Sequence, residues 1–445
     1  MLSTERTPAE APGATWSGTH TFAAPVLLRP RSAVEVQELV AQLPKVRALG
    51  TRHSFNDVAD SAGALISLVD LPADPSIDDK RSTVTVAAGT RFGNLAKYLE
   101  ANSLALHNLG SLPHISIAGA CATGTHGSGD SNGSLSTAVA GLEIVTASGE
   151  IKNFRRGDPD FGGMVLSLGA LGIVTRIELD VQPTYEVRQD AYTDLPWSRV
   201  LEDPDAVFAT GYSVSLLTDW LGDFITETLV KTRLDGDRPF ERAAVVADLT
   251  EVGSFSGVGN RTPLGGVAGP WNQRLPHFLM ESTPSDGDEI QTEYFVDRDR
   301  AAEALSAVRA LAPRIAPLLH ISELRTVAAD DLWLSPNRGA GSLAIHFTWK
   351  NLPEQVAAIL SVIEKALAPV EPRPHWGKWF HMDSDRVSSM YPRLSHFVSL
   401  SNRLDPHRKF RNSYLERVLA LPNDQTSPSA TNPTRKALRR GRQGA

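Results

Sequence analysis

The stretch from Ser116 to Gly129, SIAGACATGTHGSG, constrains the fold of this chain more than any other feature. Its side chains are nearly all small, and small side chains over such a length let a backbone lie close to a large flat or phosphorylated ligand. A flexible linker is the alternative, but linkers rarely mix Ile, Cys, Ala and His among their glycines. The stretch therefore predicts a ligand-binding segment inside a folded domain.

Two further glycine-containing segments follow the same theme. LGTRHSFN, from Leu49 to Asn56, comes directly after the short predicted strand VRALG, and a polar turn at a strand end exposes backbone N–H groups that can bind a phosphate. Taken alone, the segment is explained equally well as a turn holding a hydrogen-bonded histidine. LGALGIV, from Leu168 to Val174, is predicted to end a helix with glycine and enter a strand, either as a simple C-cap or as a ligand contact.

Composition excludes several classes of protein. A chain of 445 residues suggests two or three domains, and a net charge of -7 argues against nucleic acid or an anionic membrane as the main partner. Cys121 is the single cysteine, so no disulfide framework or cysteine zinc site is possible. No signal peptide, and no run of about 18 apolar residues, is present, so we expect a soluble cytoplasmic protein. The Ser/Pro-rich and then basic segment 421–445 predicts a disordered tail.

Helical and strand-like segments alternate along the chain, which predicts an α+β fold. The fingerprint motifs of nicotinamide-binding folds, P-loops, zincin metalloproteases and α/β-hydrolases are absent from the sequence. Helical spacing is found at 34–43, after the candidate N-cap Ser32, and at 92–104, while strands are expected at 64–71, 82–89, 141–154 (as a hairpin), 174–183, 321–327 and 342–349.

Two polar pairs suit the binding of a substrate with several hydroxyl groups. Glu323 and Arg325 are two residues apart on one predicted strand, and His346 and Thr348 repeat that spacing on another. Residues two apart on a strand share a face, so the four side chains can line one cavity with hydrogen-bond donors and acceptors. Taken without any resemblance to a known family, the residues favour a surface ion pair for the first pair and a hydrogen-bonded core histidine for the second.

The order of these segments resembles the vanillyl-alcohol-oxidase superfamily of FAD proteins and, within it, the alditol (xylitol) oxidases. The resemblance extends from about Trp16 to Ala420, and its most specific segments are SLPHIS, ATGTHGSG, SLGALGIVT, RTVAAD and PHWGK. It implies a two-domain α+β fold in which both chain ends, residues 11–184 and 379–420, form the FAD-binding domain. Residues 185–378 would form an inserted substrate (cap) domain.

The resemblance also implies that FAD is bound covalently through His53, which matches the histidine that bonds the flavin 8α-methyl carbon. The family loop commonly reads GSGHS or GGGHS, whereas here Arg52 replaces a glycine and requires a backbone that accepts a side chain. Some relatives attach FAD through a second residue, a cysteine; Leu112 stands at that position, so a single bond is expected. No metal is expected. The residues expected to contact FAD are Ala48, Leu49, Gly50, Thr51, Arg52, His53, Ser54, Ser111, Ser116, Gly119, Thr123, Gly124, Thr125, His126, Val174 and His375.

The activity implied is oxidation of the terminal hydroxyl of an alditol, such as xylitol or sorbitol, to the aldose by a monomer, with O2 reduced to hydrogen peroxide. Lys378 or His346 would accept the hydroxyl proton, and the sequence leaves both open. Gly110 would leave little bulk beside the flavin and so permit access of O2. The residues that match the family's substrate site are Ser111, Glu323, Arg325, His346, Thr348 and Lys378.

Three alternatives compete with this hypothesis. An aldonolactone oxidase or dehydrogenase would share the E-x-R pair and PHWGK, and activity on a lactone would identify it. A flavin reductase of the cell-wall precursor type would bind FAD non-covalently and be reduced by NADPH. A non-enzymatic flavoprotein that binds a partner through its basic tail would show no substrate-dependent reduction.

Overall fold

The computed structural model describes residues 9–235, 244–252, 261–282 and 287–419. The predicted tail, residues 421–445, lies outside these ranges. None of the helices in the described ranges has the length and apolar character needed to cross a membrane.

A small sheet lies near the N-terminus. Its strand β3 leads into the loop from Leu49 to Asn56, called here the glycine-led loop. Its strand order is β1-β2-β4-β3, with β2, β3 and β4 parallel and β1 antiparallel. Helix α1 begins after Ser32, whose hydroxyl oxygen accepts a hydrogen bond from the Glu35 backbone at 3.2 Å, so the predicted N-cap is confirmed. The elements are β1 Ala9–Glu10, β2 Val26–Leu28, α1 Ala33–Gln42, β3 Val46–Ala48 and β4 Ala64–Ile66.

A second, antiparallel sheet has the order β5-β6-β10-β8-β9, and its β8–β9 pair is the predicted hairpin. The small-residue stretch forms a short helix, α3, followed by a loop. The prediction that the segment from Leu168 to Val174 ends a helix with its glycine is wrong, because helix α4 already ends at Met164 and turns follow it. The elements are β5 Ser76–Asp78, β6 Thr83–Ala87, α2 Phe92–Ala101, β7 Leu104–Ala105, α3 Ile117–Thr123, β8 Val139–Val145, β9 Ile151–Arg155, α4 Phe161–Met164, β10 Ile173–Asp180 and β11 Gln182–Pro183.

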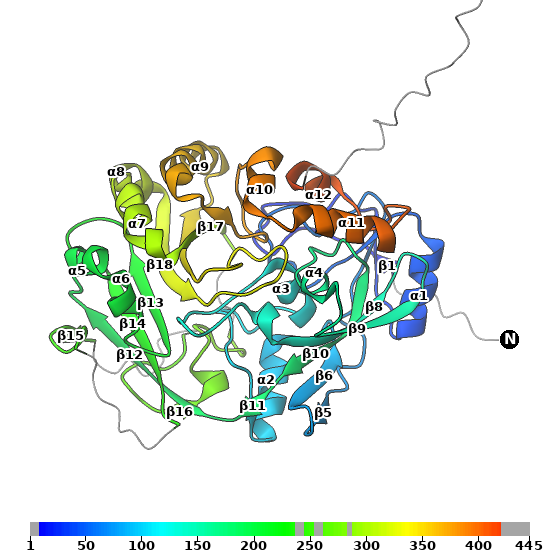
Figure 1. Ribbon diagram of the computed structural model, residues 1–445, viewed down its shortest axis with the longest axis horizontal. Helices are drawn as coiled ribbons and strands as arrows, with labels where there is room; N and C mark the ends of the chain where they lie inside the picture. Colours follow the sequence, from blue (N-terminus) through cyan, green and yellow to red (C-terminus); the bar gives the residue numbers. More distant parts are fainter. Residues whose placement is uncertain (1–8, 236–243, 253–260, 283–286, 420–445) are drawn as a thin grey trace, which may run out of the picture.

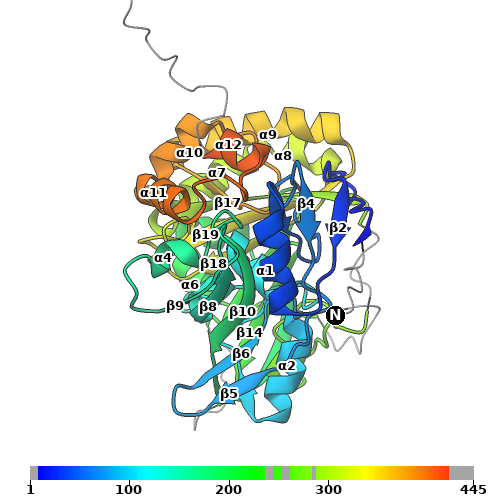
Figure 2. The same ribbon diagram turned by 90° about the vertical axis from the view of Figure 1, so that its right-hand side faces the viewer.

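A large antiparallel sheet fills the middle of the chain, with the order β15-β12-β14-β13-β18-β19-β17-β20 and β16 paired to β12. The predicted strands at 321–327 and 342–349 are the neighbours β18 and β19. Helices α7 to α12 form a row along one side of the molecule (Figures 1 and 2). The elements are β12 Glu186–Thr193, α5 Trp197–Glu202, α6 Pro204–Phe208, β13 Ser213–Thr218, β14 Glu227–Arg233, β15 Thr250–Glu251, β16 Gly269–Pro270, β17 Glu289–Asp297, α7 Ala301–Arg309, α8 Ala312–Ile315, β18 Leu319–Val327, β19 Ser342–Lys350, α9 Pro353–Leu367, β20 Arg373–Pro374, α10 Ser384–Met390, α11 Leu394–Leu404 and α12 Ser413–Val418.

The end of the chain returns to the first sheet. The buried Arg47 side chain donates to the carbonyl oxygens of Val58 and Leu168, each at 2.6 Å, and to that of Phe410 near the C-terminus. Burial lowers the pKa of Arg47 to about 10, which leaves the guanidinium charged at neutral pH. These contacts support our proposal that residues 379–420 belong with residues 11–184, while the boundaries themselves stay a prediction.

Candidate active site

One cavity of about 1110 Å³ joins the glycine-led loop to the polar side chains of the large sheet. Pockets for single small ligands measure about 300–1,000 Å³, so this cavity has room for a cofactor and a substrate together. It is lined by all the residues predicted from the sequence to contact FAD or substrate, except Gly124. Gly124 ends helix α3 with a φ of 73°, so its role is that of a C-cap.

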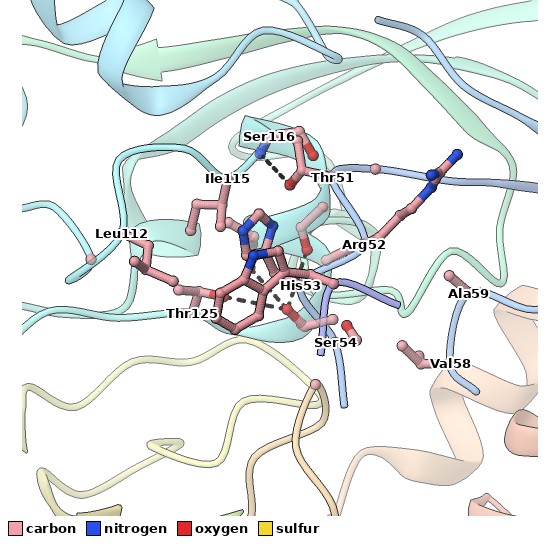
Figure 3. A pocket seen from close by; sticks show the side chains of 18 of the residues that line it. Thr51, Arg52, His53, Ser54, Val58, Ala59, Leu112, Ile115, Ser116 and Thr125 are labelled. Atoms are coloured by element: carbon pink, nitrogen blue, oxygen red, sulfur yellow. Dashed lines mark hydrogen bonds between the residues drawn. The ribbon is translucent and has the colours of Figure 1, made fainter. Parts of the chain in front are cut away.

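The loop after β3 lies directly against helix α3, and glycines make this approach possible. A Cβ atom on Gly50 would come within 2.6 Å of the Ser116 Oγ, and one on Gly119 would come within 2.9 Å of the same atom. The Ser116 backbone N–H also donates to the Thr51 Oγ1 at 3.1 Å (Figure 3). The loop and helix α3 therefore form one wall of the cavity, in which backbone without bulky side chains faces the cavity, as close binding of a cofactor requires.

His53 is held neutral in this wall. Its ring stacks on Trp16 with centroids 5.5 Å apart. Burial, with a smaller effect of the nearby Lys378, His114 and Arg91, lowers the pKa of His53 to about 4. Its buried Nδ1 atom has no hydrogen-bond partner among the described residues. A neutral imidazole with a free ring nitrogen is the form that can bond to an electrophilic carbon.

The polar cluster on the large sheet follows from strand pairing. His346 on β19 stands opposite Glu323 on β18 and opposite Glu293 on β17. Directly opposed residues share a face of the sheet, so these three side chains form one row. Thr348 stands in the adjacent row, opposite Gln291. The His346 Nε2 lies 3.2 Å from the Thr348 Oγ1.

Arg325 is buried between two carboxylates. Its Nη2 donates to the Glu293 Oε1 at 2.7 Å, its Nε lies 3.7 Å from the Glu323 Oε2, and its Nη1 lies 3.4 Å from the Ser111 Oγ. Burial raises the pKa of both carboxyls, but Arg325 and the neighbouring histidines together outweigh burial, so both pKa values lie well below the usual range. The interpretation of Glu323 and Arg325 as a surface ion pair is therefore wrong, because both are buried in the cavity wall.

Lys378 reaches the same cavity from the turn after β20. The Gly377 carbonyl accepts a hydrogen bond from the Phe55 N–H at 2.8 Å, which ties this turn to the loop that carries His53. The Lys378 ammonium donates to the Gln291 Oε1 and lies 4.8 Å from the centre of the Phe55 ring. Burial lowers the pKa of Lys378 to about 8. The ammonium therefore stands between the two halves of the cavity and is mainly charged at neutral pH.

Known proteins identify the family. Residues 24–155 match the FAD binding domain family, and residues 287–418 match the D-arabinono-1,4-lactone oxidase family. An alditol oxidase from Streptomyces sp. is 43% identical over 410 residues, which cover 91% of this chain and 98% of that protein. The chain belongs to the alditol oxidase family.

More distant relatives and solved structures agree with this assignment. An L-gulono-1,4-lactone dehydrogenase from Mycobacterium tuberculosis is 29% identical, with 91% of this chain and 98% of that protein covered. A solvent-stable cholesterol oxidase has the same fold, with a TM-score of 0.75 at 17% identity, covering 93% of this chain and 98% of that chain. The predicted fold class, a vanillyl-alcohol-oxidase-type α+β fold with an FAD-binding domain and a second domain, is confirmed.

Arg52, which stands where the family's usual loop has glycine, adopts a backbone conformation that glycine favours. Its φ is 65°, in the left-handed region, and its carbonyl accepts a hydrogen bond from the Trp16 N–H at 2.8 Å. The side chain extends away from His53 (Figure 3). Arg52 therefore has a strained backbone, because the left-handed conformation destabilises a residue with a Cβ atom by about 1–2 kcal/mol.

Arg52→Gly should raise stability slightly. Relief of the left-handed strain is worth about 1–2 kcal/mol, and the greater freedom of glycine in the unfolded chain offsets roughly half of it. The thermal unfolding midpoint should therefore rise by about 1–2 °C. The same substitution at Arg31, an exposed residue without a positive φ, should lower the midpoint or leave it unchanged. A fall for Arg52→Gly would mean that its side chain makes a stabilising contact.

The site residues that were not predicted from the sequence include Glu293, Gln291 and His277. Glu293 and Gln291 alternate along β17, EIQTEYFVD, with the same spacing as the polar pairs on β18 and β19, so strand period could have revealed them. His277 lies in a loop, and its Nε2 is 2.8 Å from the Glu323 Oε1. No spacing in the sequence points to His277.

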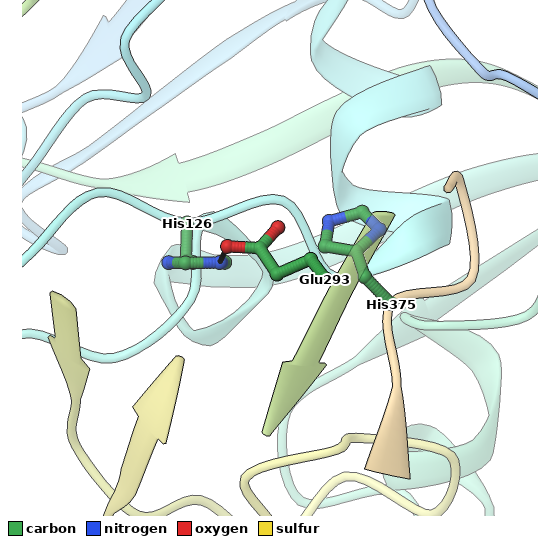
Figure 4. A group of neighbouring side chains, drawn as sticks. All are labelled: His126, Glu293 and His375. Atoms are coloured by element: carbon green, nitrogen blue, oxygen red, sulfur yellow. Dashed lines mark ion pairs between the residues drawn. The ribbon is translucent and has the colours of Figure 1, made fainter. Parts of the chain in front are cut away.

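His126, Glu293 and His375 form a compact group whose possible ligand atoms all lie within 4.8 Å of one another (Figure 4). Arg325 already places a positive charge 2.7 Å from the Glu293 carboxylate, which disfavours a metal ion there. The His126 Nδ1 donates to the Gly127 carbonyl at 2.8 Å, and the His375 Nδ1 accepts from the Gly377 N–H at 3.0 Å. We interpret the group as a hydrogen-bond network beside the cavity.

Cys121 is not suited to a second bond to FAD. Its side chain is buried in helix α3, and burial raises the pKa of the thiol to about 12. A thiol that stays protonated at neutral pH is a poor nucleophile. Leu112, at the position where some relatives carry the second linking cysteine, lines the cavity on the side of His53 (Figure 3).

Proposed function

We propose that this protein oxidises the terminal hydroxyl of an alditol, such as xylitol or sorbitol, to the aldose, with O2 as the electron acceptor. The observation that carries the proposal is the single cavity that joins the FAD-binding loops to a row of polar side chains across β18, β19 and β17. Those side chains offer donors and acceptors at several neighbouring points, as a chain of adjacent hydroxyls requires. All of them come from one chain, so the proposed active unit is the monomer.

The backbone wall at Gly50, Gly119 and Ser116 would hold the pyrophosphate of FAD, and the free Nδ1 of His53 would form the covalent bond to the flavin. When bound, FAD takes a hydride from the alcohol carbon and passes both electrons to O2, which with two protons gives hydrogen peroxide. A Cβ atom on Gly110 would meet only ordinary contacts, the nearest at 3.5 Å, so this position leaves space for O2 beside the cofactor.

The chain's own residues bind the alcohol and move its hydroxyl proton. Glu323, Arg325, Ser111 and Thr348 would position the hydroxyls of the substrate, and placement of this kind supplies much of the rate. Loss of a hydride leaves positive charge on the alcohol unless its hydroxyl proton also departs, so a proton acceptor lowers the barrier. His346 and Lys378 both line the cavity, and each is a candidate for this proton acceptor.

The state of Lys378 should appear in the pH dependence. With a pKa of about 8, the amine is charged below that pH and neutral above it. If the ammonium holds the reacting oxygen, the rate of anaerobic flavin reduction by xylitol should fall as the pH rises through about 8. Lys378→Arg keeps the charge at alkaline pH and should remove this fall, while Lys378→Met should be slow at every pH. An unchanged alkaline fall in Lys378→Arg would assign it to another group.

A second candidate is oxidation of an aldonolactone, which the match of residues 287–418 to a lactone oxidase family favours. One experiment separates the candidates. The purified protein is precipitated with acid to look for yellow colour in the pellet, and a native aliquot is mixed anaerobically with xylitol or L-gulono-1,4-lactone while absorbance near ~450 nm is followed, where oxidised flavin absorbs. Bleaching by xylitol supports the proposal. Bleaching by the lactone alone, or by NADPH alone, would replace it.

A further inference from the structure

Glu293 is a deeply buried carboxylate of the site. It contacts two histidines in addition to its ion-pair partner Arg325. Its side chain is 1% exposed. One carboxylate oxygen, Oε1, lies 2.7 Å from the Arg325 Nη2 and 3.2 Å from the His126 Nε2. The other oxygen, Oε2, lies 3.5 Å from the His346 Nδ1. Arg325, His126 and His346 thus meet at the Glu293 carboxylate. Figure 4 shows this carboxylate between His126 and His375.

The position of the carboxylate decides which nitrogen of His346 carries the proton. A neutral imidazole has one N–H and one lone pair. A lone pair on Nδ1 would face the Glu293 carboxylate at 3.5 Å, which is repulsive, whereas an N–H there is attracted. The Nε2 atom faces the Thr348 hydroxyl at 3.2 Å, and a hydroxyl can donate to a lone pair. The Glu293 carboxylate therefore favours the tautomer with the proton on Nδ1 and the lone pair on Nε2, and the Thr348 hydroxyl can donate to that lone pair.

The same surroundings distinguish His346 from Lys378. Burial lowers the pKa of His346 and is partly opposed by Glu293, with Lys378 and Arg325 lowering it further, so the imidazole is neutral at neutral pH. The Lys378 ammonium is mainly charged there, and a charged ammonium has no lone pair to offer. At neutral pH the main form of His346 can accept a proton, whereas the main form of Lys378 cannot.

We propose that Glu293 is a positioning residue that fixes His346 in the Nδ1–H tautomer, so that the His346 Nε2 accepts the hydroxyl proton of the substrate. The substrate oxygen would bind at the Nε2 side, near Thr348. The O–H bond breaks as the carbon gives up its hydride, and the proton moves to Nε2, which leaves an imidazolium facing the Glu293 carboxylate. This inference rests on the proposed alcohol oxidation only for the identity of the proton donor.

The first test needs no substrate. In the holoenzyme labelled with ¹⁵N-histidine, the resonances of His346 are assigned by their loss in His346→Gln. We expect a protonated Nδ1 and an unprotonated Nε2 in the wild-type protein. In Glu293→Gln we expect the apparent pKa of His346 to fall, because the carboxylate that raises it is gone. Protonation of Nε2 in the neutral wild-type ring would overturn the proposal.

The second test is a double-mutant cycle on the rate of anaerobic flavin reduction by xylitol. Glu293→Gln should slow the wild-type enzyme roughly tenfold to a hundredfold, which is less than the loss of a whole general base, because the imidazole itself remains. In a His346→Gln background it should have almost no further effect. An equal loss in both backgrounds would show that Glu293 acts only through Arg325 and would overturn the assignment.

Glu364→Gln is the matched control for both tests. Glu364 is also a buried carboxylate beside β17, but it accepts a hydrogen bond from the Tyr294 hydroxyl at 2.9 Å, away from the cavity. It should leave the His346 resonances and the rate unchanged. If wild-type enzyme reacts with no alditol, the proposed function fails, and the tautomer measurement still decides the role of Glu293.

Discussion

Replacing His53 with alanine should leave a protein from which acid releases all of the flavin. The loop from Leu49 to Asn56 then carries no imidazole, and the neighbouring thiol of Cys121 stays protonated, with a pKa of about 12. The wild-type protein should give a yellow pellet after acid precipitation, and His53→Ala a colourless pellet beneath a yellow supernatant. Mass spectrometry of the denatured chains should show the mass of FAD on the wild-type protein alone.

His114 provides the control for this measurement. It lies near enough to lower the pKa of His53, and its Nε2 lies 3.0 Å from the Met280 carbonyl. His114→Ala removes an imidazole of the same kind from the same region, yet the pellet should remain yellow. A yellow pellet from His53→Ala would place the bond on another residue, whereas a colourless pellet from the wild-type protein would show that FAD is held without a covalent bond.

Strand period made part of the site predictable. Glu323 with Arg325, and His346 with Thr348, could be assigned to shared faces because side chains on a strand alternate between two sides. The sequence did not predict that these pairs would meet across strands, because that depends on the strand order β18-β19-β17. Strand β17 precedes β18 along the chain, yet it pairs with the far edge of β19. Glu293 was missed because no strand was predicted over residues 289–297, and its position opposite His346 depends in addition on that strand order.

Local composition predicted that the cofactor side of the cavity has a close backbone approach, but it did not predict the detailed geometry of that side. Small residues from Ser116 to Gly129 indicated a close backbone approach, and the structure places Gly119 against Gly50 and the Ser116 hydroxyl. The division of that stretch into helix α3 and a loop, and the capping role of Gly124, depend on tertiary contacts that composition does not encode. The left-handed φ of Arg52 is a similar case, because the residue type argues against the conformation that the fold imposes.

Arg325→Met should be the most destabilising single change in the site. The guanidinium neutralises the buried carboxylates of Glu293 and Glu323, and its removal leaves two negative charges in a wall shielded from water. Breaking a buried ion pair by removing one partner costs about 3–5 kcal/mol. Flavin reduction by xylitol should be lost as well, because the arginine is one of the groups that would position the hydroxyls.

The pH dependence of this loss identifies its cause. In the wild-type protein both carboxyl pKa values are depressed, so their contribution to stability is present above the ordinary glutamate pKa of about 4.3 and is lost as the pH falls through the lower folded values. Without Arg325, burial raises the pKa of both groups, and acid then relieves the repulsion. The stability deficit of Arg325→Met should be largest at neutral pH and shrink as the pH falls toward about 5.

Arg298 offers a surface counterpart with the same arrangement of charges. Its guanidinium contacts Asp130 and Asp205, but these two carboxylates are 37% and 68% exposed. Solvent screens such pairs, so Arg298→Met should cost about 1 kcal/mol or less. Thermal unfolding of both variants between pH 5 and pH 8 makes the comparison. Equal losses at every pH would mean that Arg325 stabilises the fold through packing of its side chain, and not through the two buried charges that it holds together.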